Sequence, residues 1–214
     1  FGERGRLDGG HTAFDTCTYT RKEIERLARK GFELAQSRSK KLCCVDKANV
    51  LESSRLWRET VQALEKDYPD VEVAYEFVDA VAMRLVQWPN SYDVLITENL
   101  FGDILTDEAS VISGSMGLMP SASVGEINAL YEPIHGSFPQ ATGFGIANPL
   151  ATVLSAAMMF EMSFGLMEEG KMIRAVVDQS LAEGMVTEDL KENGEKGIST
   201  SEVGDYLVSK ILAS

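Results

Sequence analysis

Cysteine and long apolar runs are scarce in this chain. Its 3 cysteines, Cys17, Cys43 and Cys44, have neither the even number of a disulfide framework nor the spacing of a zinc site. We therefore expect buried, reduced thiols. No run approaches the roughly 18 apolar residues that cross a bilayer, and no secretory signal pattern opens the sequence. These absences predict a soluble cytoplasmic protein with no membrane partner.

Positive charge is also in short supply. The chain has 20 Lys and Arg against 33 Asp and Glu, a formal net charge of -13 over 214 residues. Nucleic-acid binding needs clustered basic side chains, so we expect no nucleic-acid partner. The composition, 44% hydrophobic and 25% charged, is that of a globular protein with a sizeable core. The chain opens on Phe1 within a glycine-rich segment typical of a domain interior, which predicts a fragment of a longer protein.

Apolar periodicity predicts alternating helices and strands before residue 98 and mainly helices after it. The predicted helices before that point cover residues 20–37 and about 53–68, with a third ending near 88, and the strands cover 41–46, 71–78 and 94–97. Longer helices follow at 100–113, 148–164, 172–183 and 201–213, joined by glycine-rich loops. This alternation predicts an α/β fold with a boundary near Glu98. The nearly all-apolar segment 151–166 predicts a buried or interface helix.

Charged side chains follow three of the predicted strands. Lys47 and Asp79 each end a strand, and Asp103 and Asp107 lie on one face of the next helix. Ligands of α/β sheets gather at the carboxyl ends of strands, and carboxylate oxygens suit Mg²⁺ or Mn²⁺. Each residue also has a plainer interpretation: a surface lysine, a helix N-cap at Asp79, and a solvated acidic face.

A second candidate site is the loop YEPIHGSFPQATGFGIANP over residues 131–149. Its glycines allow close approach to a ligand, and a helix predicted to begin near Asn148 favours an anionic group such as a pyrophosphate. The conventional Rossmann fingerprint GxGxxG is missing. His135 alone is more often a structural histidine, and His11 gives no usable signal.

Three segments together resemble the β-decarboxylating dehydrogenases: VDKANVLESSRLWRE, NLFGDILTDEASVISGSMGLMPSAS and the loop above. DKANVL followed by SRLWR resembles the isopropylmalate branch, with tartrate and D-malate dehydrogenases as the nearest alternative. The resemblance implies an isopropylmalate dehydrogenase-like two-domain α/β fold, not a conventional Rossmann fold, here lacking its N-terminal part. Residues 1–98 would belong to the central substrate and dimerisation domain, and residues 99–214 would form the C-terminal half of the nucleotide-binding domain.

The resemblance also implies a mechanism. The family joins two subunits around a shared active site, where Lys47 and Asp79 of one chain meet Asp103 and Asp107 of the other. Mg²⁺ or Mn²⁺ would bind the three aspartates, with Lys47 as the catalytic base. The implied reaction is NAD-linked oxidative decarboxylation of 3-isopropylmalate to 2-oxoisocaproate, in leucine biosynthesis. The family's catalytic tyrosine and substrate arginines would lie upstream, so residues 1–214 alone should not turn over.

In the family the loop wraps the adenosine half of NAD. The implied cofactor contacts are His135, Gly136, Ser137, Phe138, Pro139, Gln140 and Asn148. The family typically has HGSAPD where this chain has HGSFPQ, so Gln140 replaces an aspartate that holds the adenine ribose and repels the 2′-phosphate of NADP. NAD remains the expected cofactor. A different class of function, a non-catalytic dimerisation or binding module, stays open because long apolar helices can also form interfaces.

Overall fold

The computed structural model describes residues 2–191 and 195–213. By its internal contacts the chain divides into two compact units, Phe1–Glu108 and Ala109–Ser214, each described below by itself. The division lies within the helix α4 (Asn99–Ile112). The assignment of residues 1–98 and 99–214 to substrate and nucleotide domains remains a prediction.

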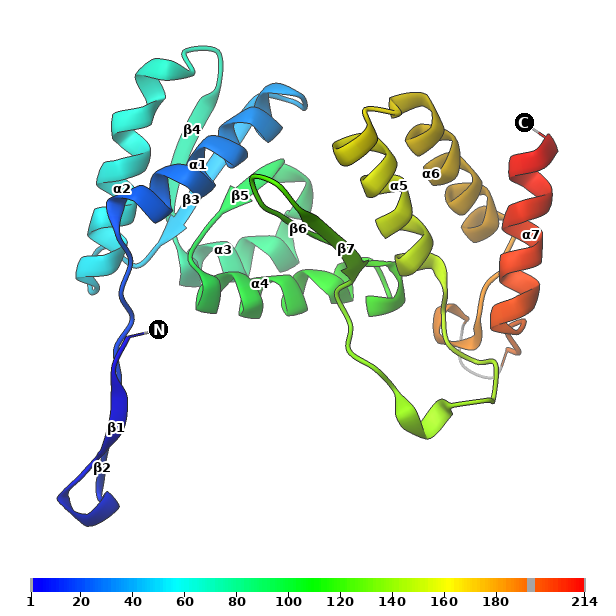
Figure 1. Cartoon of the computed structure of the whole chain (residues 1–214), viewed down its shortest axis with the longest axis horizontal. Coiled ribbons are helices and arrows are strands. Elements are labelled where there is room, and N and C mark those ends of the chain that lie inside the picture. The colour runs from blue at the N-terminus through cyan, green and yellow to red at the C-terminus, as the bar shows by residue number, and fades with distance from the viewer. Residues whose placement is uncertain (1, 192–194, 214) are drawn as a thin grey trace. The chain divides into compact units, whose positions relative to one another are not determined.

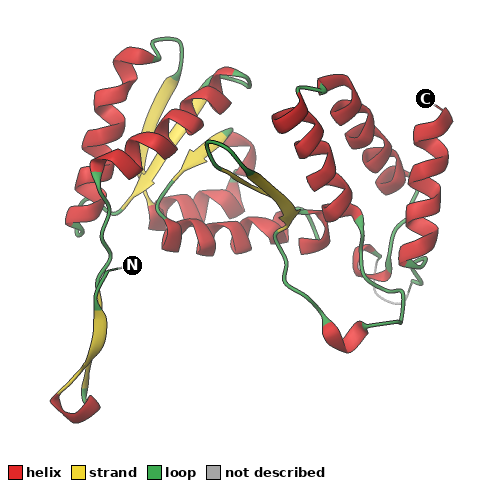
Figure 2. Cartoon of the chain, in the orientation of Figure 1, coloured by secondary structure: helices red, strands yellow, loops and turns green. Residues whose placement is uncertain are grey.

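A three-stranded parallel sheet forms the centre of the first unit, in the order β4-β3-β5 (Figure 2). Helices connect the parallel strands, as the alternating sequence pattern predicted. The elements are α1 (Arg21–Gln36), β3 (Lys41–Asp46), α2 (Glu52–Leu64), β4 (Glu72–Phe77), α3 (Val78–Gln87), β5 (Val94–Ile96) and the start of α4. The predicted boundaries are within a few residues of these, and the last turn of the predicted second helix is a short 3-10 turn, Glu65–Asp67.

Successive side chains of β3 point to opposite faces of the sheet, and each face is covered by helices (Figure 1). Leu42 and Cys44 pack in one cluster with apolar residues of α1 and α2. Cys43 and Val45 pack in a second cluster with residues of α3 and α4. Because β3 is buried on both faces, its sequence is a continuous apolar run rather than an alternating one.

The helix α1 shows how local sequence signals and packing agree. Thr20 and Glu23 form a capping box, in which each side chain accepts a hydrogen bond from the backbone N–H of the other residue. The following apolar stripe is buried, with Ile24, Ala28 and Phe32 fully covered. This stripe is the one from which the helix was predicted.

Two antiparallel hairpins lie outside the strands that the apolar periodicity predicts. The first pairs β1 (Arg4–Leu7) with β2 (Thr12–Asp15), and the second pairs β6 (Pro120–Val124) with β7 (Ala129–Pro133). Nearly all side chains of β1 and β2 are exposed, so their sequences lack the apolar alternation that marks a half-buried strand. Backbone pairing across a glycine-rich turn stabilises them instead.

Helices dominate the second unit. It contains α5 (Leu150–Phe164), α6 (Met167–Ala182) and α7 (Thr200–Ala213), and α5 packs against both α6 and the β6–β7 hairpin. The apolar segment at α5 was predicted to be buried, and Leu150, Ala151 and Ala157 are fully covered. The helix α6 begins five residues before the predicted 172, because Gly170, which lowers helix propensity, is accommodated against the Glu161 side chain.

The thiols divide into two kinds. Cys43 and Cys44 are buried, as expected, and burial raises the pKa of the Cys43 thiol to about 12. Cys17 is exposed, so the expectation of three buried thiols was wrong for this residue. It follows β2 outside the cores of the two units, where little covers it. Within the described residues no helix is both long and apolar enough to cross a membrane.

A close approach of α1 to the sheet at Gly31 predicts a stability effect. A Cβ at Gly31 in α1 would lie 2.3 Å from Ile96 Cγ2, so Gly31→Ala should destabilise the protein by about 1–3 kcal/mol through overpacking, despite alanine's better helix propensity. Urea unfolding measures this free energy. The matched control is Gly204→Ala in α7, where nothing lies within 4 Å, and a gain of up to about 1 kcal/mol is expected. Equal effects at both sites would contradict the packing argument.

Candidate functional site

Lys47 and Asp79 meet at the carboxyl edge of the sheet. Parallel pairing of β3 with β4 sets Asp46 beside Phe77, so the residues that follow both strands leave the sheet at the same edge. Lys47 Nζ donates a hydrogen bond to Asp79 Oδ1 in an ion pair. The Lys47 ammonium beside Asp79, together with the Asp79 backbone N–H, holds the pKa of this carboxyl below its usual range. The structure thus brings together two of the four residues expected to form the catalytic centre.

Asp79 is not the helix N-cap that its sequence position allowed. The strand β4 ends at Phe77, which is the N-cap residue of α3 and makes no side-chain capping bond. Asp79 lies within the first turn of α3, and its side chain is 62% exposed. An acidic side chain in this turn is stabilised by the helix dipole while its oxygens remain accessible to a ligand.

Asp103 and Asp107 lie on an exposed stripe of α4. They share one helical face with Leu100 and Ile104, which are 46% and 58% exposed, whereas Leu105 points into the core. The predicted placement of the two aspartates on one helix face is correct. Two large apolar side chains left in solvent beside them are the features of an interaction surface.

The start of α4 is fixed by a buried carboxylate. Glu98 is 7% exposed and accepts hydrogen bonds from the backbone N–H groups of Leu100 and Phe101 at 3.0 and 2.8 Å. The Tyr19 hydroxyl donates to Glu98 at 2.8 Å, and burial together with this carboxylate raises the Tyr19 pKa to about 12. The Glu98 side chain therefore satisfies two of the free N–H donors of the helix that bears Asp103.

The three aspartates offer hard oxygen donors, which fit Mg²⁺ or Mn²⁺. Across residues 2–191 and 195–213, however, no group of three or more His, Cys, Asp or Glu side chains is close enough to hold a metal ion. One chain therefore supplies the expected ligands from two separate places, α3 and α4. The meeting of these ligands across two chains, expected from the sequence, remains a prediction.

The loop expected to contact the cofactor is open to solvent. His135 Nδ1 forms a hydrogen bond with the backbone oxygen of Gly136 at 3.1 Å, and Phe138 is 64% exposed. Gly143 and Gly145 have φ of +85° and +64°, a backbone conformation that side chains rarely adopt. The residues from Gly136 to Gln140 are all exposed, so their backbone and side chains are accessible to a ligand.

Asn148 is the most firmly held residue of this loop. Its Oδ1 accepts a hydrogen bond from Leu150 N at the start of α5, and its Nδ2 donates to Asp189 Oδ2, both at 3.0 Å. Asp189 also accepts hydrogen bonds from the hydroxyls of Ser115 and Thr187, each at 2.5 Å. Since a carboxylate only accepts hydrogen bonds, the Asn148 amide nitrogen must face Asp189 and the amide oxygen must face Leu150 N.

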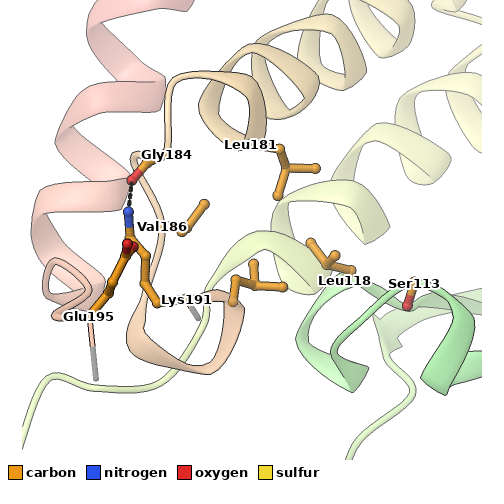
Figure 3. Close-up of a pocket in the computed structure, with 8 residues that line it drawn as sticks. Ser113, Leu118, Leu181, Gly184, Val186, Lys191 and Glu195 are labelled. Carbon is orange, nitrogen blue, oxygen red and sulfur yellow. Dashed lines mark hydrogen bonds between the residues drawn. The ribbon is translucent and has the colours of Figure 1, made fainter. Parts of the chain in front are cut away.

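The second unit also contains a cavity. Its volume is about 430 Å³, and Lys191 at its edge donates to the Gly184 backbone oxygen at 2.9 Å (Figure 3). The lining residues are Ser113, Leu118, Leu181, Gly184, Val186, Leu190, Lys191 and Glu195. None of them is a predicted site residue.

Comparison with known proteins decides the family. The family described as isocitrate/isopropylmalate dehydrogenase matches residues 1–207 of this chain. The chain belongs to this family. The resemblance inferred from three sequence segments is therefore confirmed, and with it the isocitrate/isopropylmalate dehydrogenase-like α/β fold.

Individual members of the isocitrate/isopropylmalate dehydrogenase family are similar over nearly the whole chain. A 3-isopropylmalate dehydrogenase of Desulfitobacterium hafniense is 50% identical over 211 residues, which are 99% of this chain and 60% of that protein. One from Bacteroides fragilis is 53% identical over 211 residues, covering 99% and 59%. The chain thus spans about three fifths of the length of these curated relatives.

Solved structures of the isocitrate/isopropylmalate dehydrogenase family agree. The crystal structure of isocitrate dehydrogenase from Methylococcus capsulatus matches with a TM-score of 0.91 and 35% identity, over 98% of this chain and 63% of that one. An apo β-decarboxylating dehydrogenase from Thermococcus kodakarensis matches with a TM-score of 0.88 and 37% identity, over 100% and 61%.

Several residues around the candidate site were missed by the sequence interpretation. Arg58 forms an ion pair with the buried Asp46 next to Lys47, and Asp189 holds Asn148. Asp46 immediately precedes Lys47 at the end of an apolar strand, and a charge in that position was a signal that could have been used. Nothing local in the sequence links Asp189 to Asn148, because the contact joins distant segments.

The Asp189 contacts predict a pH-dependent contribution to stability. Burial raises the pKa of Asp189, but the hydrogen bonds from Ser115, Thr187 and Asn148 outweigh it, so the folded-state pKa lies below the usual value. The stabilisation should be present above the unfolded-state pKa of about 3.9 and be lost as pH falls through the lower folded value.

Asp189 is exposed, so water screens its interactions, and Asp189→Asn should reduce the free energy of unfolding by at most about 1 kcal/mol at pH 7. The difference from the unmodified protein should be smaller at pH 3, below the unfolded-state pKa of about 3.9, than at pH 7. Urea unfolding at the two pH values measures both quantities. An unfolding free energy unchanged by the substitution at pH 7 would refute the stabilising role.

Proposed function

We propose that this chain is part of a cytoplasmic enzyme that oxidatively decarboxylates 3-isopropylmalate to 2-oxoisocaproate with NAD, a step of leucine biosynthesis. The observation on which the proposal depends is the Lys47–Asp79 ion pair at the carboxyl edge of the sheet. In this pair the lysine that we propose as the base lies beside a carboxylate suited to a divalent cation. The 3-isopropylmalate dehydrogenases to which the chain is similar support the choice of substrate.

Lys47 acts as the general base in this proposal. Its amine, once deprotonated, takes the proton of the substrate's C2 hydroxyl, directly or through a water molecule, as a hydride leaves that carbon. The C2 carbon becomes a ketone, and the bond between C3 and its carboxylate then breaks, releasing CO2 and leaving the electron pair in an enolate of C2 and C3. The resulting enolate is then protonated to give 2-oxoisocaproate. Bound NAD would accept the hydride, and a bound divalent cation would stabilise the developing enolate charge as a Lewis acid.

Asp79, Asp103 and Asp107 would hold the cation. All three carboxylates are exposed and are oxygen donors, which are the ligands that Mg²⁺ and Mn²⁺ take in proteins. Lys47 lies against Asp79, so a cation on Asp79 would place the substrate hydroxyl near the Lys47 amine. The choice between the two metals does not affect this arrangement.

The exposed stripes of α3 and α4 support a homodimer with a shared active site. Asp79 shares one face of α3 with Met83 and Val86, which are 61% and 66% exposed. The matching stripe of α4 combines Asp103 with exposed Ile104. Pairing the two stripes with those of a second copy would bury these apolar side chains in a four-helix interface and bring aspartates of both copies together.

The exposed β1–β2 hairpin gives independent support for a homodimer. A two-stranded hairpin is marginally stable alone in water, and both of its outer edges have unpaired backbone groups. Leu7 and Phe14 on it are 54% and 39% exposed. A second copy could cover both the edges and these side chains.

The loop from His135 to Asn148 would bind the adenosine half of NAD. The exposed backbone from Gly136 to Gln140 is accessible to the ligand, and Asn148 has a fixed amide orientation. Gln140 can hydrogen-bond ribose hydroxyls and, being neutral, repels a 2′-phosphate less than an aspartate would.

Two other functions are compatible with parts of these observations. A tartrate- or D-malate-type decarboxylating dehydrogenase would use the same base and metal carboxylates, since only the recognition of the substrate's side group differs. A non-catalytic dimerisation module would use the apolar stripes alone. It would have no reason to bind Mg²⁺ through the aspartates.

The deciding experiment compares NADH production by the full-length protein with 3-isopropylmalate, D-malate and tartrate. The proposal expects the highest kcat/KM with 3-isopropylmalate. A preference for D-malate or tartrate would show that the proposed substrate is wrong and that the proposed reaction, oxidative decarboxylation, is right. No NADH with any of the three, together with no Mn²⁺ binding, would favour the non-catalytic module.

Lys47→Met should lower kcat by at least about 100-fold, because general-base catalysis supplies roughly this factor. Mn²⁺ affinity should change little, since the carboxylates remain. Steady-state NADH production and Mn²⁺ titration measure the two effects. Lys41→Met, at the opposite end of β3, is the matched control and should retain activity. Normal turnover by Lys47→Met would show that another group is the base.

The cofactor preference can be tested at Gln140. With NAD and NADP compared in the same assay, kcat/KM should be higher for NAD. Gln140→Asp should increase this preference for NAD, because the introduced carboxylate repels the 2′-phosphate of NADP. A clear preference of the unmodified protein for NADP would contradict the assignment.

A further inference from the structure

Asp46, which immediately precedes Lys47, is tied to α2 by a bidentate ion pair. Arg58 Nε and Nη2 donate to its Oδ2 and Oδ1 at 2.8 and 3.0 Å. The Asp46 side chain is only 1% exposed. Two parallel hydrogen bonds between planar groups fix orientation as well as distance.

The same contacts hold the backbone of the turn around Lys47. Asp46 Oδ1 also accepts a hydrogen bond from Ala48 N at 2.9 Å, and Arg55 Nε donates to Ala48 O at 2.9 Å. The Lys47 backbone oxygen accepts from Val50 N at 2.9 Å. With the peptide groups on either side of Lys47 held, the direction in which its side chain leaves the turn is set.

Arg58 and Lys47 also approach the same aromatic ring. The guanidinium carbon of Arg58 lies 5.3 Å from the centre of the Phe77 ring, and Lys47 Nζ lies 5.8 Å from it. Phe77 is paired with Asp46 in the parallel register of β3 and β4. Aromatic faces attract cations, so the ring contributes to the location of both.

We propose that Arg58 is a positioning residue for Lys47, acting through the Asp46 carboxylate and the Phe77 ring. The inference rests on the proposed function, since that function makes Lys47 the base. Asp46 is buried and Arg58 is 28% exposed, and an ion pair in such a position usually contributes little net stability compared with apolar side chains of the same volume. Its consequence here is geometric: it holds the Lys47 turn and leaves the amine against Asp79.

The test is Arg58→Lys in the full-length protein. Lysine keeps a positive charge near Asp46 but loses the planar fork and the flat contact with the ring. Displacing a base by about 1 Å can cost 100-fold, so kcat should fall about 10- to 100-fold. The KM values for 3-isopropylmalate and NAD should stay within about twofold, because neither ligand touches Arg58 in the proposed site.

A deuterium isotope effect separates positioning from simple loss of folded protein. With 3-isopropylmalate deuterated at C2, the isotope effect on kcat should increase if the chemical step has become slower relative to product release. Partial unfolding would instead lower kcat and leave the isotope effect unchanged. An unchanged isotope effect, or an unchanged kcat, would overturn the proposal.

Arg174→Lys is the matched control. Arg174 Nε and Nη2 also form a bidentate pair, with Glu161 at 2.8 and 2.8 Å, but within the second unit. Arg174→Lys should lose a similar bidentate interaction and leave kcat unchanged. An equal fall in kcat for both variants would also count against positioning.

Phe77→Leu keeps the proposal testable if Arg58→Lys does not fold. Leucine preserves apolar bulk and removes the ring, so kcat should fall with the same increase in isotope effect. Failure of this proposal is distinguishable from failure of the proposed function. If Lys47→Met retains turnover, the base assignment is wrong; if only Lys47→Met loses it, the base is right and the positioning role of Arg58 is wrong.

Discussion

The parallel pairing of β3 with β4 is the constraint on which the candidate site depends. It sets Asp46 beside Phe77 at the ends of the two strands. Lys47 and Asp79, which follow these strands, then lie at the same edge of the sheet and form an ion pair. A shift of the register by one residue would turn the side chains of β4 to the opposite face and separate the pair. The buried clusters on both faces of β3 prevent that shift, because each face has its own set of apolar partners. Core packing and site geometry are therefore one property of this sheet.

Much of the fold could be predicted from the sequence, since its helices have strong periodic signals. The capping box at Thr20 and the continuous apolar run of β3 are local patterns that match the structure. The β1–β2 hairpin could not be predicted in the same way, because side chains such as Leu7 and Phe14 are exposed and backbone pairing defines its strands. Apolar periodicity does not predict a strand that is stabilised by main-chain hydrogen bonds rather than by burial of its side chains.

The candidate site also contains residues that could be predicted from the sequence and residues that could not. Lys47 and Asp79 could be found because both follow buried strands, and the sheet then brings them together. The arginine that holds the Lys47 turn and the carboxylate that holds Asn148 were not predicted, since each contact joins residues from different elements. Side chains that position a functional group need only be near it in space. Their sequence separation is set by the fold, which a single sequence reveals only indirectly.

The uneven exposure of the cysteines has a practical consequence. Cys43 and Cys44 are buried, and the raised pKa of Cys43 keeps its thiol protonated and unreactive at neutral pH. Cys17 is exposed and lies just after the β1–β2 hairpin. A thiol-specific spin label or fluorophore would therefore attach at one natural position without any engineered substitution. Dipolar or energy-transfer measurements between such labels would give the separation of the hairpins in any assembly that contains two copies of the chain.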